Sequence, residues 1–300
     1  MAAEPLYLAI DQGTHASRAV VLDARGGVVA TGSCDLGLSR PQPDWAEQDG
    51  EEMVDSVLAA ASRALAELGD RRHHLAAAGL ASQRASCACW DRRDGRPLSP
   101  VFSWQDRRAH AWLRQFEPQA EEVHRKTGLF LSAHYGASKL RWALENLPAV
   151  REARGRETCA GGCASFLVFP AHLERAMFAD PQCAARTQLW NLRTRDWDPA
   201  LLSLFGVPSG HLPRSVPTRH PFGTIRIGDV AVPLVAVNGD QSAAVFAFGA
   251  PDEECAYVNI GTSAFVQRAV STRLRPMRHA VSRESSSRTK TGRSIPSKAT

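Results

Sequence analysis

The sequence has no run of eighteen apolar residues, so it contains no segment long enough to cross a membrane as a helix. Its first residues, MAAEPLYLAID, show neither the basic stretch nor the apolar core of a secretory signal peptide. Both absences favour a cytoplasmic protein that works without a membrane partner.

Zinc-binding spacings and the P-loop are missing as well. Cys87-Ala-Cys89 and Cys159-x3-Cys163 do not have the usual zinc spacings, and no matching histidine pairs accompany them. No G-x-x-x-x-G-K-[ST] motif occurs, which excludes the P-loop mode of phosphate binding. We interpret the seven cysteines as reduced thiols in apolar surroundings: Cys34, Cys87, Cys89, Cys159, Cys163, Cys183 and Cys255.

Basic charge is concentrated at one end of the chain. The net charge is +5, but residues 273–300 hold eight of the 36 Lys and Arg residues and one of the 31 Asp and Glu residues, which leaves −2 for residues 1–272. This mild acidity gives no support for a nucleic-acid partner. Residues 271–300 contain few large apolar side chains, so we expect a disordered basic tail. A non-native end from truncation or a frameshift is favoured over a tail that recruits an acidic partner.

What the sequence does contain is one pattern that occurs twice. The apolar strand Leu6 to Ile10 runs into Asp11-Gln12-Gly13-Thr14 and then a returning strand. Near the other end, Val258-Asn259-Ile260 runs into Gly261-Thr262 and a second returning strand. A turn of this kind presents backbone N–H groups and a hydroxyl to one point, which suits a phosphate. Two such hairpins facing each other could bind a polyphosphate from both sides.

Between these hairpins, strands alternate with helices. Asp49 and Glu52 form a capping box at the start of a helix whose apolar face runs to Leu68. The mixture predicts the α/β class, beginning with an antiparallel meander. Strands are expected over 6–10, 18–23, 28–32, 75–81, 86–90 and 232–237, helices over 106–147 with breaks near Gly128 and His134, a surface connection over 148–164, and a helix over 242–248.

Nine segments together resemble the FGGY family of carbohydrate kinases, and the glycerol kinases within it, over roughly residues 6–268. They follow the family's order and spacing. They are IDQGTHASRAVVLD, PDWAEQD, SQR, WDRRDGRPL, SWQDRR, TGLFLSAHYGASKLRW, ARTQLWNLRTRDWD, NGDQSAAVF and NIGTSAF.

The resemblance implies a ribonuclease-H/actin-like domain with a mixed sheet and flanking helices, followed by the first hairpin of a second such domain. Residues 1–250 would be the N-terminal, sugar- or polyol-binding domain. Residues 251–270 would begin a nucleotide-binding domain, most of which this chain does not contain, and residues 271–300 would be the tail. In the family, ATP and the sugar lie between the two domains.

The resemblance also assigns the nucleotide site. Asp11 would hold Mg²⁺ through water, because hard cations prefer carboxylate oxygen; a turn-capping aspartate is the alternative. Arg18 would add charge near the transferring phosphate, or simply form a surface ion pair. His15 and Ala16 stand where the family usually has hydroxyl side chains, so only their backbone amides would donate. The residues expected to contact ATP are Gly13, Thr14, His15, Ala16, Arg18, Gly261 and Thr262.

Asp240 would accept the proton of the substrate hydroxyl. Its alternative role is helix N-cap. Gln241 would bind a substrate hydroxyl, and Arg84 and Trp104 match the family's substrate-binding arginine and tryptophan. His134 stands where glycerol kinases have tyrosine, with Tyr135 one position later. Ala85 replaces their glutamate, so a related polyol or ketose is as well supported as glycerol.

The sequence therefore predicts ATP- and Mg²⁺-dependent phosphorylation of a small polyol or sugar. The alternative is a non-catalytic, truncated remnant of the kinase fold that acts at most as a binding or interaction protein. Another actin-type ATPase is disfavoured by the nine collinear segments. The oligomeric state is left open, and a homo-oligomer is compatible with the sequence.

Overall fold

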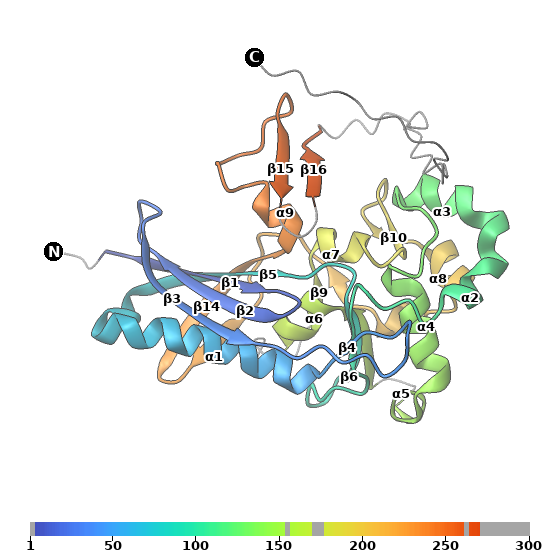
Figure 1. The fold of residues 1–300 in the computed structure, drawn as a ribbon, viewed down its shortest axis with the longest axis horizontal. Helices are drawn as coiled ribbons and strands as arrows, with labels where there is room; N and C mark the ends of the chain where they lie inside the picture. Colours follow the sequence, from blue (N-terminus) through green and yellow to red (C-terminus); the bar gives the residue numbers. More distant parts are fainter. Residues whose placement is uncertain (1–3, 154–156, 170–176, 261–263, 271–300) are drawn as a thin grey trace, which may run out of the picture.

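The computed structural model describes residues 4–153, 157–169, 177–260 and 264–270 (Figure 1). The expected tail at 271–300, and Gly261 and Thr262 of the second turn, lie outside the described residues. Within them, a large mixed sheet and one long helix occupy one end of the molecule, and a group of shorter helices occupies the other.

The large sheet has six strands in the order β13-β14-β5-β1-β2-β3. β1, β2 and β3 form the predicted antiparallel meander, while β5 and β14 run parallel to β1. Alternate side chains of β1 are buried, as expected for a strand with one covered face. The strands are β1 (Leu6–Gln12), β2 (Ala16–Leu22), β3 (Val28–Asp35), β5 (Leu75–Ser82), β13 (Thr224–Ile227) and β14 (Val230–Gly239).

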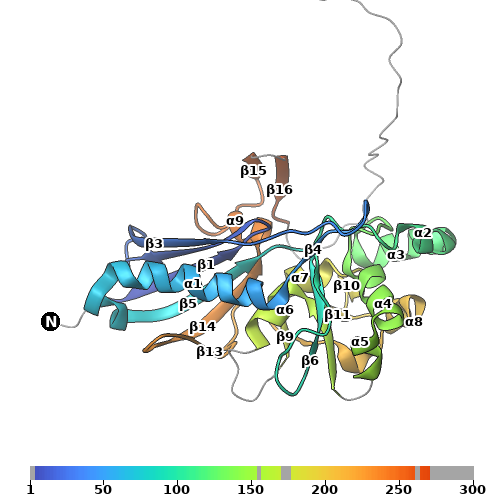
Figure 2. The ribbon, with the colours of Figure 1, turned by 60° about the horizontal axis from the view of Figure 1, so that its bottom comes forward.

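Helix α1 (Gly50–Leu68) covers one face of this sheet (Figure 2). The Asp49 side chain accepts from the backbone N–H groups of Glu51 and Glu52, so the predicted cap is confirmed. The second bond that a capping box requires, from the Asp49 backbone N–H to the Glu52 carboxylate, was predicted wrongly. The Glu52 carboxylate accepts instead from the Gly37 N–H at 2.9 Å, because the chain after β3 passes close to the start of the helix. The 3₁₀ helix η1 (Gly69–His74) follows α1.

Gly32 allows α1 to approach β3 closely, and its replacement by alanine is expected to destabilise the protein. A Cβ at this position would lie 2.1 Å from the Ala60 carbonyl oxygen and 2.7 Å from the Ala64 nitrogen. Both are backbone atoms, so helix and strand must separate, at a cost of about 2–3 kcal/mol of unfolding free energy. Urea unfolding measures this loss. The control is Gly210→Ala, whose methyl group meets nothing within 4 Å; equal losses in both variants would contradict the prediction.

A second sheet of four strands, in the order β4-β7-β6-β8, joins the large sheet to the helical end. The prediction of a surface connection over 148–164 is wrong, because all five residues of β8 are buried and pair with β6. Glycine and alanine make this stretch resemble a loop, yet the missing side chain at Gly161 lets Pro213 and Trp90 pack against it. The strands are β4 (Glu47–Gln48), β6 (Cys87–Asp91), β7 (Val101–Phe102) and β8 (Thr158–Gly162).

The helical end has its own apolar core, which includes Leu140, Leu144 and Phe205. The predicted helix break is confirmed at Gly128, whose φ of 70° ends α3. The helices here are α2 (His110–Leu113), η2 (Arg114–Gln119), α3 (Ala120–Thr127), α4 (Gly136–Asn146), α5 (Pro148–Glu152), α7 (Pro181–Ala185), α8 (Pro199–Phe205) and η4 (Ser209–His211). Short strand pairs join them: β9 (Phe178–Ala179) with β12 (Arg214–Ser215), and β10 (Trp190–Asn191) with β11 (Asp196–Trp197). Helix α6 (Cys163–Val168) instead packs Ala164 and Val168 into the core beneath the large sheet.

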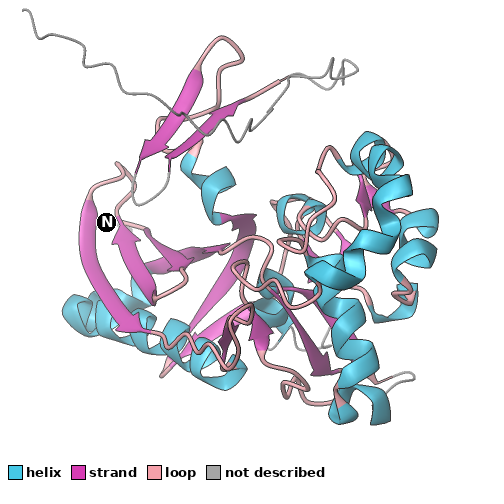
Figure 3. Ribbon diagram, turned by 45° about the vertical axis from the view of Figure 1, so that its right-hand side comes forward, coloured by secondary structure: helices cyan, strands magenta, loops and turns pink. Residues whose placement is uncertain are grey.

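The chain leaves β14 through α9 (Asp240–Ala244), which begins two residues earlier than predicted and is shorter. The second hairpin, β15 (Ala256–Ile260) with β16 (Ala264–Arg268), projects from the rest of the described chain (Figure 3). It pairs with no other strand among the described residues, and Val258, Ile260 and Val266 are 57%, 77% and 72% exposed. Within the described residues, no second sheet covers the apolar side chains of this hairpin.

All seven cysteines are free. Five are buried, as predicted, and Cys34 is half-buried, but Cys255 is exposed just before β15, so the apolar surroundings expected for it are wrong. No helix in the described ranges is long and apolar enough to span a membrane.

Candidate active site

Three parallel neighbouring strands end at the same edge of the large sheet, and each brings a predicted site residue there. In register, Asp11 of β1 and Asn238 of β14 lie on either side of Ala81 of β5. Asp240 directly follows β14, and Arg84 follows β5 by two residues. With one strand between them, β1 and β14 are about 10 Å apart. Ligand sites of α/β sheets lie outside such carboxyl ends.

Asp240 lies beside Arg84. Arg84 Nε is 3.5 Å from Asp240 Oδ1, and the same oxygen accepts from the Gln241 N–H at 2.6 Å. Burial raises the pKa of Asp240 and the nearby Asp11 carboxylate adds to the rise, while the Gln241 N–H and Arg84 oppose it. Asp240 is the first residue of α9 and does not cap it; Gly239 is the N-cap.

Asp11 faces Arg18 across the β1–β2 pair. Burial raises the pKa of the Asp11 carboxyl group, and the Arg18 guanidinium opposes the rise. The described residues provide no hydrogen-bond or ion-pair partner for this carboxylate, and they contain no group of three or more His, Cys, Asp and Glu side chains that could hold a metal ion. A cation here would therefore take carboxylate oxygen from Asp11, with water or phosphate as its other ligands, as Mg²⁺ prefers.

A closed ring of hydrogen bonds joins the first turn to the predicted substrate side. Trp104 Nε1–H donates to Thr14 Oγ1 at 2.9 Å, and the Trp104 backbone N–H donates to Ser86 Oγ at 2.9 Å. Ser86 Oγ donates to Gln83 Oε1 at 2.8 Å, and Gln83 Nε2 donates to Gln48 Oε1 at 2.8 Å. Gln48 Nε2 closes the ring on the Thr14 carbonyl at 2.7 Å. The ring fixes Trp104 relative to the turn.

The turn itself is held by further bonds. The Gly13 N–H donates to the Ala16 carbonyl at 3.0 Å, and Gln12 Nε2 donates to the Gly13 carbonyl at 2.6 Å. His15 is exposed at the tip. Sequence reasoning missed the glutamines at 12, 48 and 83, since the network forms only when segments distant in the chain meet.

Trp104, His134 and Tyr135 lie together. The Trp104 and His134 ring centroids are 5.8 Å apart, and those of His134 and Tyr135 are 4.9 Å apart, both edge to face. Burial, together with the positive charges of Lys139, Arg186, Arg107 and Arg84, lowers the pKa of His134 to about 4. His134 is therefore neutral at physiological pH. The predicted substrate residues Arg84, Trp104, His134 and Tyr135 are thus brought to one side of the site.

Gln241 turns toward the second hairpin. Asn259 Nδ2 donates to Gln241 Oε1 at 3.3 Å, and Gln267 Nε2 donates to the Gln241 carbonyl at 2.7 Å. The side chain predicted to bind substrate therefore contacts the hairpin. Gly261 and Thr262, predicted to bind phosphate, lie outside the described residues.

Two cations were missed by the sequence reasoning. Lys139 is fully buried in α4, and Arg186 lies near enough to influence the pKa of Arg84, His134 and Asp240. A signal for Lys139 existed, since it lies four residues before Ala143, on the apolar face of a short helix.

Comparisons with known proteins identify the family of this chain. The model of the FGGY family of carbohydrate kinases, N-terminal domain, matches residues 6–247. The chain belongs to the FGGY family of carbohydrate kinases. Two of its relatives are glycerol kinases. That of Polaromonas naphthalenivorans is 37% identical over 245 residues, covering 80% of this chain and 49% of the relative. That of Deinococcus radiodurans is 34% identical over 270 residues, covering 89% and 54%.

Solved structures of FGGY-type kinases share the fold. Glycerol kinase of Plasmodium falciparum with ADP has a TM-score of 0.82 at 23% identity, covering 88% of this chain and 54% of that one. Xylulose kinase of Rhodospirillum rubrum has a TM-score of 0.79 at 20% identity, covering 86% and 54%. The predicted ribonuclease-H/actin-like fold is confirmed. The chain spans about half the length of the curated relatives it matches.

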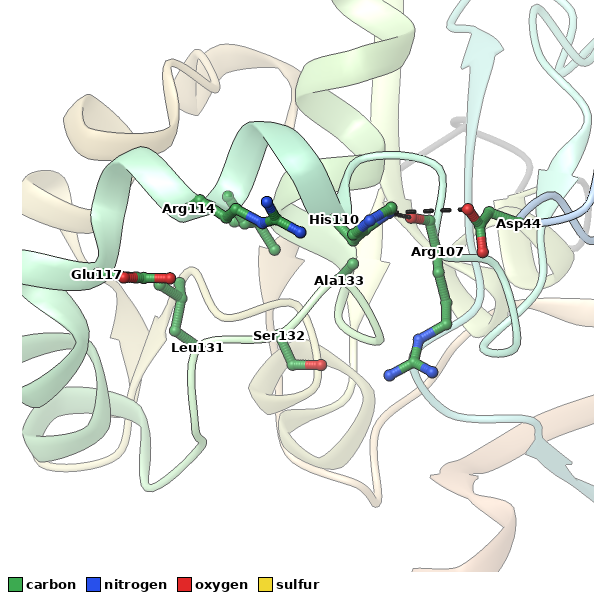
Figure 4. A pocket seen from close by; sticks show the side chains of 9 residues that line it. Asp44, Arg107, His110, Arg114, Glu117, Leu131, Ser132 and Ala133 are labelled. Atoms are coloured by element: carbon green, nitrogen blue, oxygen red, sulfur yellow. Dashed lines mark hydrogen bonds and ion pairs between the residues drawn. The ribbon is translucent and has the colours of Figure 1, made fainter. Parts of the chain in front are cut away.

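A cavity of about 480 Å³ lies along α2 and η2, and its wall includes Ala133, the residue before the predicted substrate residue His134 (Figure 4). Its walls carry Arg107, His110 and Arg114, with the carboxylates of Asp44 and Glu117. His110 Nδ1 is directed at Asp44 Oδ2, 3.9 Å away. Arg107 also helps to lower the pKa of His134, so the cavity and the substrate side share this residue.

Proposed function

We propose that this chain provides the acceptor-binding half of an ATP-dependent kinase for a small polyol or sugar, with Asp240 as the general base. The observation that carries the proposal is the meeting of Asp11, Arg84 and Asp240 at the carboxyl ends of three parallel strands. Membership of a carbohydrate kinase family supports the reaction class.

Phosphoryl transfer needs neutralised phosphate charge, an aligned acceptor hydroxyl and a group to take its proton. Asp240 would take the proton, and the rise in its pKa from burial makes it a better proton acceptor. Arg84 would orient the acceptor next to it, since its Nε already lies 3.5 Å from Asp240.

ATP would bind at the first turn and the second hairpin. Gly13, Thr14 and the amides of His15 and Ala16 would contact the transferring phosphate, with Arg18 adding charge. Asp11 would hold Mg²⁺, which when bound would neutralise the phosphates. Gly261 and Thr262 would contact the α- and β-phosphates of the nucleotide.

The acceptor would lie against Trp104, His134 and Tyr135, with Gln241 at its edge. Because Ala85 provides no carboxylate for hydroxyl recognition, a ketose or a polyol other than glycerol fits the site as well as glycerol does. The same substitution, with Ala16 in the first turn, favours the second candidate function, a non-catalytic binding protein. Its location in the cytoplasm stays a prediction.

An assay of ADP release across a panel of polyols and ketoses tests the proposal. We expect acceptor-dependent ADP release and a phosphorylated product by mass spectrometry. Binding of an acceptor without any product would support the non-catalytic alternative. ATP hydrolysis that is the same with and without every acceptor would contradict the kinase function.

Gly239→Ala is expected to weaken acceptor binding. A Cβ at 239 would lie 2.4 Å from both Cγ and Cδ of Arg84, so that side chain must leave its place beside Asp240. Displacing a substrate-positioning group should raise the KM of the acceptor about tenfold or more. Steady-state kinetics measure this rise. The control is Gly79→Ala, whose methyl group makes an ordinary 3.9 Å contact with Ala236; an unchanged acceptor KM in Gly239→Ala would contradict the placement of Arg84.

A further inference from the structure

Lys139 is a fully buried lysine whose ammonium group donates only to backbone carbonyls. Its Nζ lies 2.7 Å from the Ser103 carbonyl oxygen, 2.8 Å from that of His134 and 3.3 Å from that of Ala85. An ammonium group has three protons, so all its donors are used. Burial lowers the pKa of Lys139 to about 8, partly offset by Cys87 and Asp106. A buried charge is costly unless it is well bonded, and these three bonds compensate for it.

Each of the three carbonyls belongs to a different segment of the proposed acceptor site. Ala85 follows Arg84, Ser103 precedes Trp104, and His134 is itself a predicted substrate residue. These segments come from the loop after β5, the stretch after β7 and the loop before α4. No strand pairing joins all three, so the lysine is the one group bonded to each of them in the described part of the chain.

The backbone at Ala85 shows that this arrangement carries strain. Its φ is 64°, a left-handed conformation that costs a residue with a Cβ free energy. Such a conformation persists only where its surroundings hold it. The Lys139 ammonium group, bonded to the Ala85 carbonyl, is part of what holds it.

We propose that Lys139 is a positioning residue of the acceptor site, whose ammonium group sets the spacing between Arg84, Trp104 and His134. The lysine touches neither acceptor nor nucleotide in this role. It acts through the three segments, and its loss lets them move apart. This inference rests on the proposed function for its kinetic consequence, but its structural consequence does not depend on catalysis.

The test compares Lys139→Met with Arg141→Met in the full chain. Methionine fills similar space without donating hydrogen bonds. Arg141 lies on the same helix, and its side chain donates to the Gly206 carbonyl at 3.1 Å, toward α8 and away from the acceptor side. Its replacement therefore also removes a charged donor to a backbone carbonyl, but it leaves the bonds to the three segments intact. Two NMR readouts need no turnover: the titration of the His134 ring, assigned with His134→Gln, and the Trp104 indole N–H signal, assigned with Trp104→Phe.

In Lys139→Met we expect the His134 midpoint, about 4 in the wild type, to rise by about half a pH unit or more, since one of the cations acting on it is gone. Arg186, Arg107 and Arg84 remain in the variant and keep the pKa of His134 below its usual value. The Trp104 indole signal should shift, because its bond to Thr14 is disturbed. In the acceptor assay, the KM of the acceptor should rise about tenfold while that of ATP stays within about twofold. Arg141→Met should leave all of these unchanged.

Unchanged His134 and Trp104 signals in a folded Lys139→Met protein would overturn the proposal, as would equal effects in Arg141→Met. If Lys139→Met does not fold, Lys139→Gln replaces it, since the amide keeps two donors without the charge. Unfolding of both variants would also overturn the proposal, because Lys139 would then support the whole domain and not the acceptor site. If the wild type phosphorylates nothing, the proposed function fails, and the NMR readouts still decide the role of Lys139.

Discussion

Replacing Asp240 with asparagine is expected to lower kcat for acceptor phosphorylation by about 10²–10⁴-fold, the range for removing a general base. Asparagine has the same shape and can still accept the Gln241 N–H, but it cannot take a proton from the acceptor. The KM of the acceptor should change less than kcat, because the Arg84 side chain and the Trp104–His134 pair remain. Steady-state kinetics on the full chain measure both parameters.

Stability separates a catalytic effect from simple unfolding in this variant. The raised pKa of Asp240 means that its charged form is less favourable in the folded state than in the unfolded state. Asparagine removes that charge, so the free energy of unfolding at neutral pH should not fall. The control is Asp49→Asn, since asparagine preserves a helix cap, and its activity should match the wild type. Wild-type kcat in a folded Asp240→Asn protein would exclude Asp240 as the base.

The largest loss of stability is expected from Asp106→Ala. Asp106 and Arg108 are almost fully buried. Arg108 Nη2 lies 2.7 Å from Asp106 Oδ2 and 2.6 Å from Glu47 Oε1. The guanidinium lies over the rings of Trp45, Phe102 and Trp142. Breaking a buried ion pair costs about 3–5 kcal/mol, and the Asp106→Ala variant leaves the buried Arg108 with the partly exposed Glu47 as its carboxylate partner. Asp106 Oδ2 also accepts a hydrogen bond from the Ala46 backbone N–H at 2.8 Å, and in the variant this N–H loses its acceptor.

Chemical denaturation of Asp106→Ala and of an exposed control distinguishes the two kinds of ion pair. Glu122 pairs with Arg125 on the surface of α3, where solvent screens the charges, so Glu122→Gln should change the free energy of unfolding far less. Similar losses in the two variants would show that the Asp106–Arg108 pair contributes no more than a surface pair. The Asp106 carboxylate also helps to keep the Lys139 ammonium charged, so Asp106→Ala should weaken the acceptor side too.

Much of the fold follows from local patterns. The antiparallel meander is readable because glycine turns separate short runs of alternating side chains, and α1 because Asp49 stands directly before an apolar stripe. β8 is not readable, because alanine and glycine have weak strand preference, and its pairing with β6 is what makes it a strand. Strand formation at residues 158–162 therefore depends on a partner that is distant in the sequence.

For the site too, the sequence indicates some residues and contacts but not others. The resemblance to FGGY kinases points to Asp11, Arg84 and Asp240, and the sheet brings the strand ends near these residues together. The sequence does not predict that Glu52 bonds Gly37 or that Gln241 bonds the second hairpin, since neither partner is nearby in the chain. Nor does it predict the three carbonyls around Lys139, which meet only after the loops have closed.

The bonds from Asn259 and Gln267 to Gln241 connect the second hairpin to the residue that directly follows Asp240. A rotation of that hairpin about its base would therefore pull on the first turn of α9 and swing the Asp240 carboxylate with it. The position of that hairpin and the orientation of the Asp240 carboxylate would then change together.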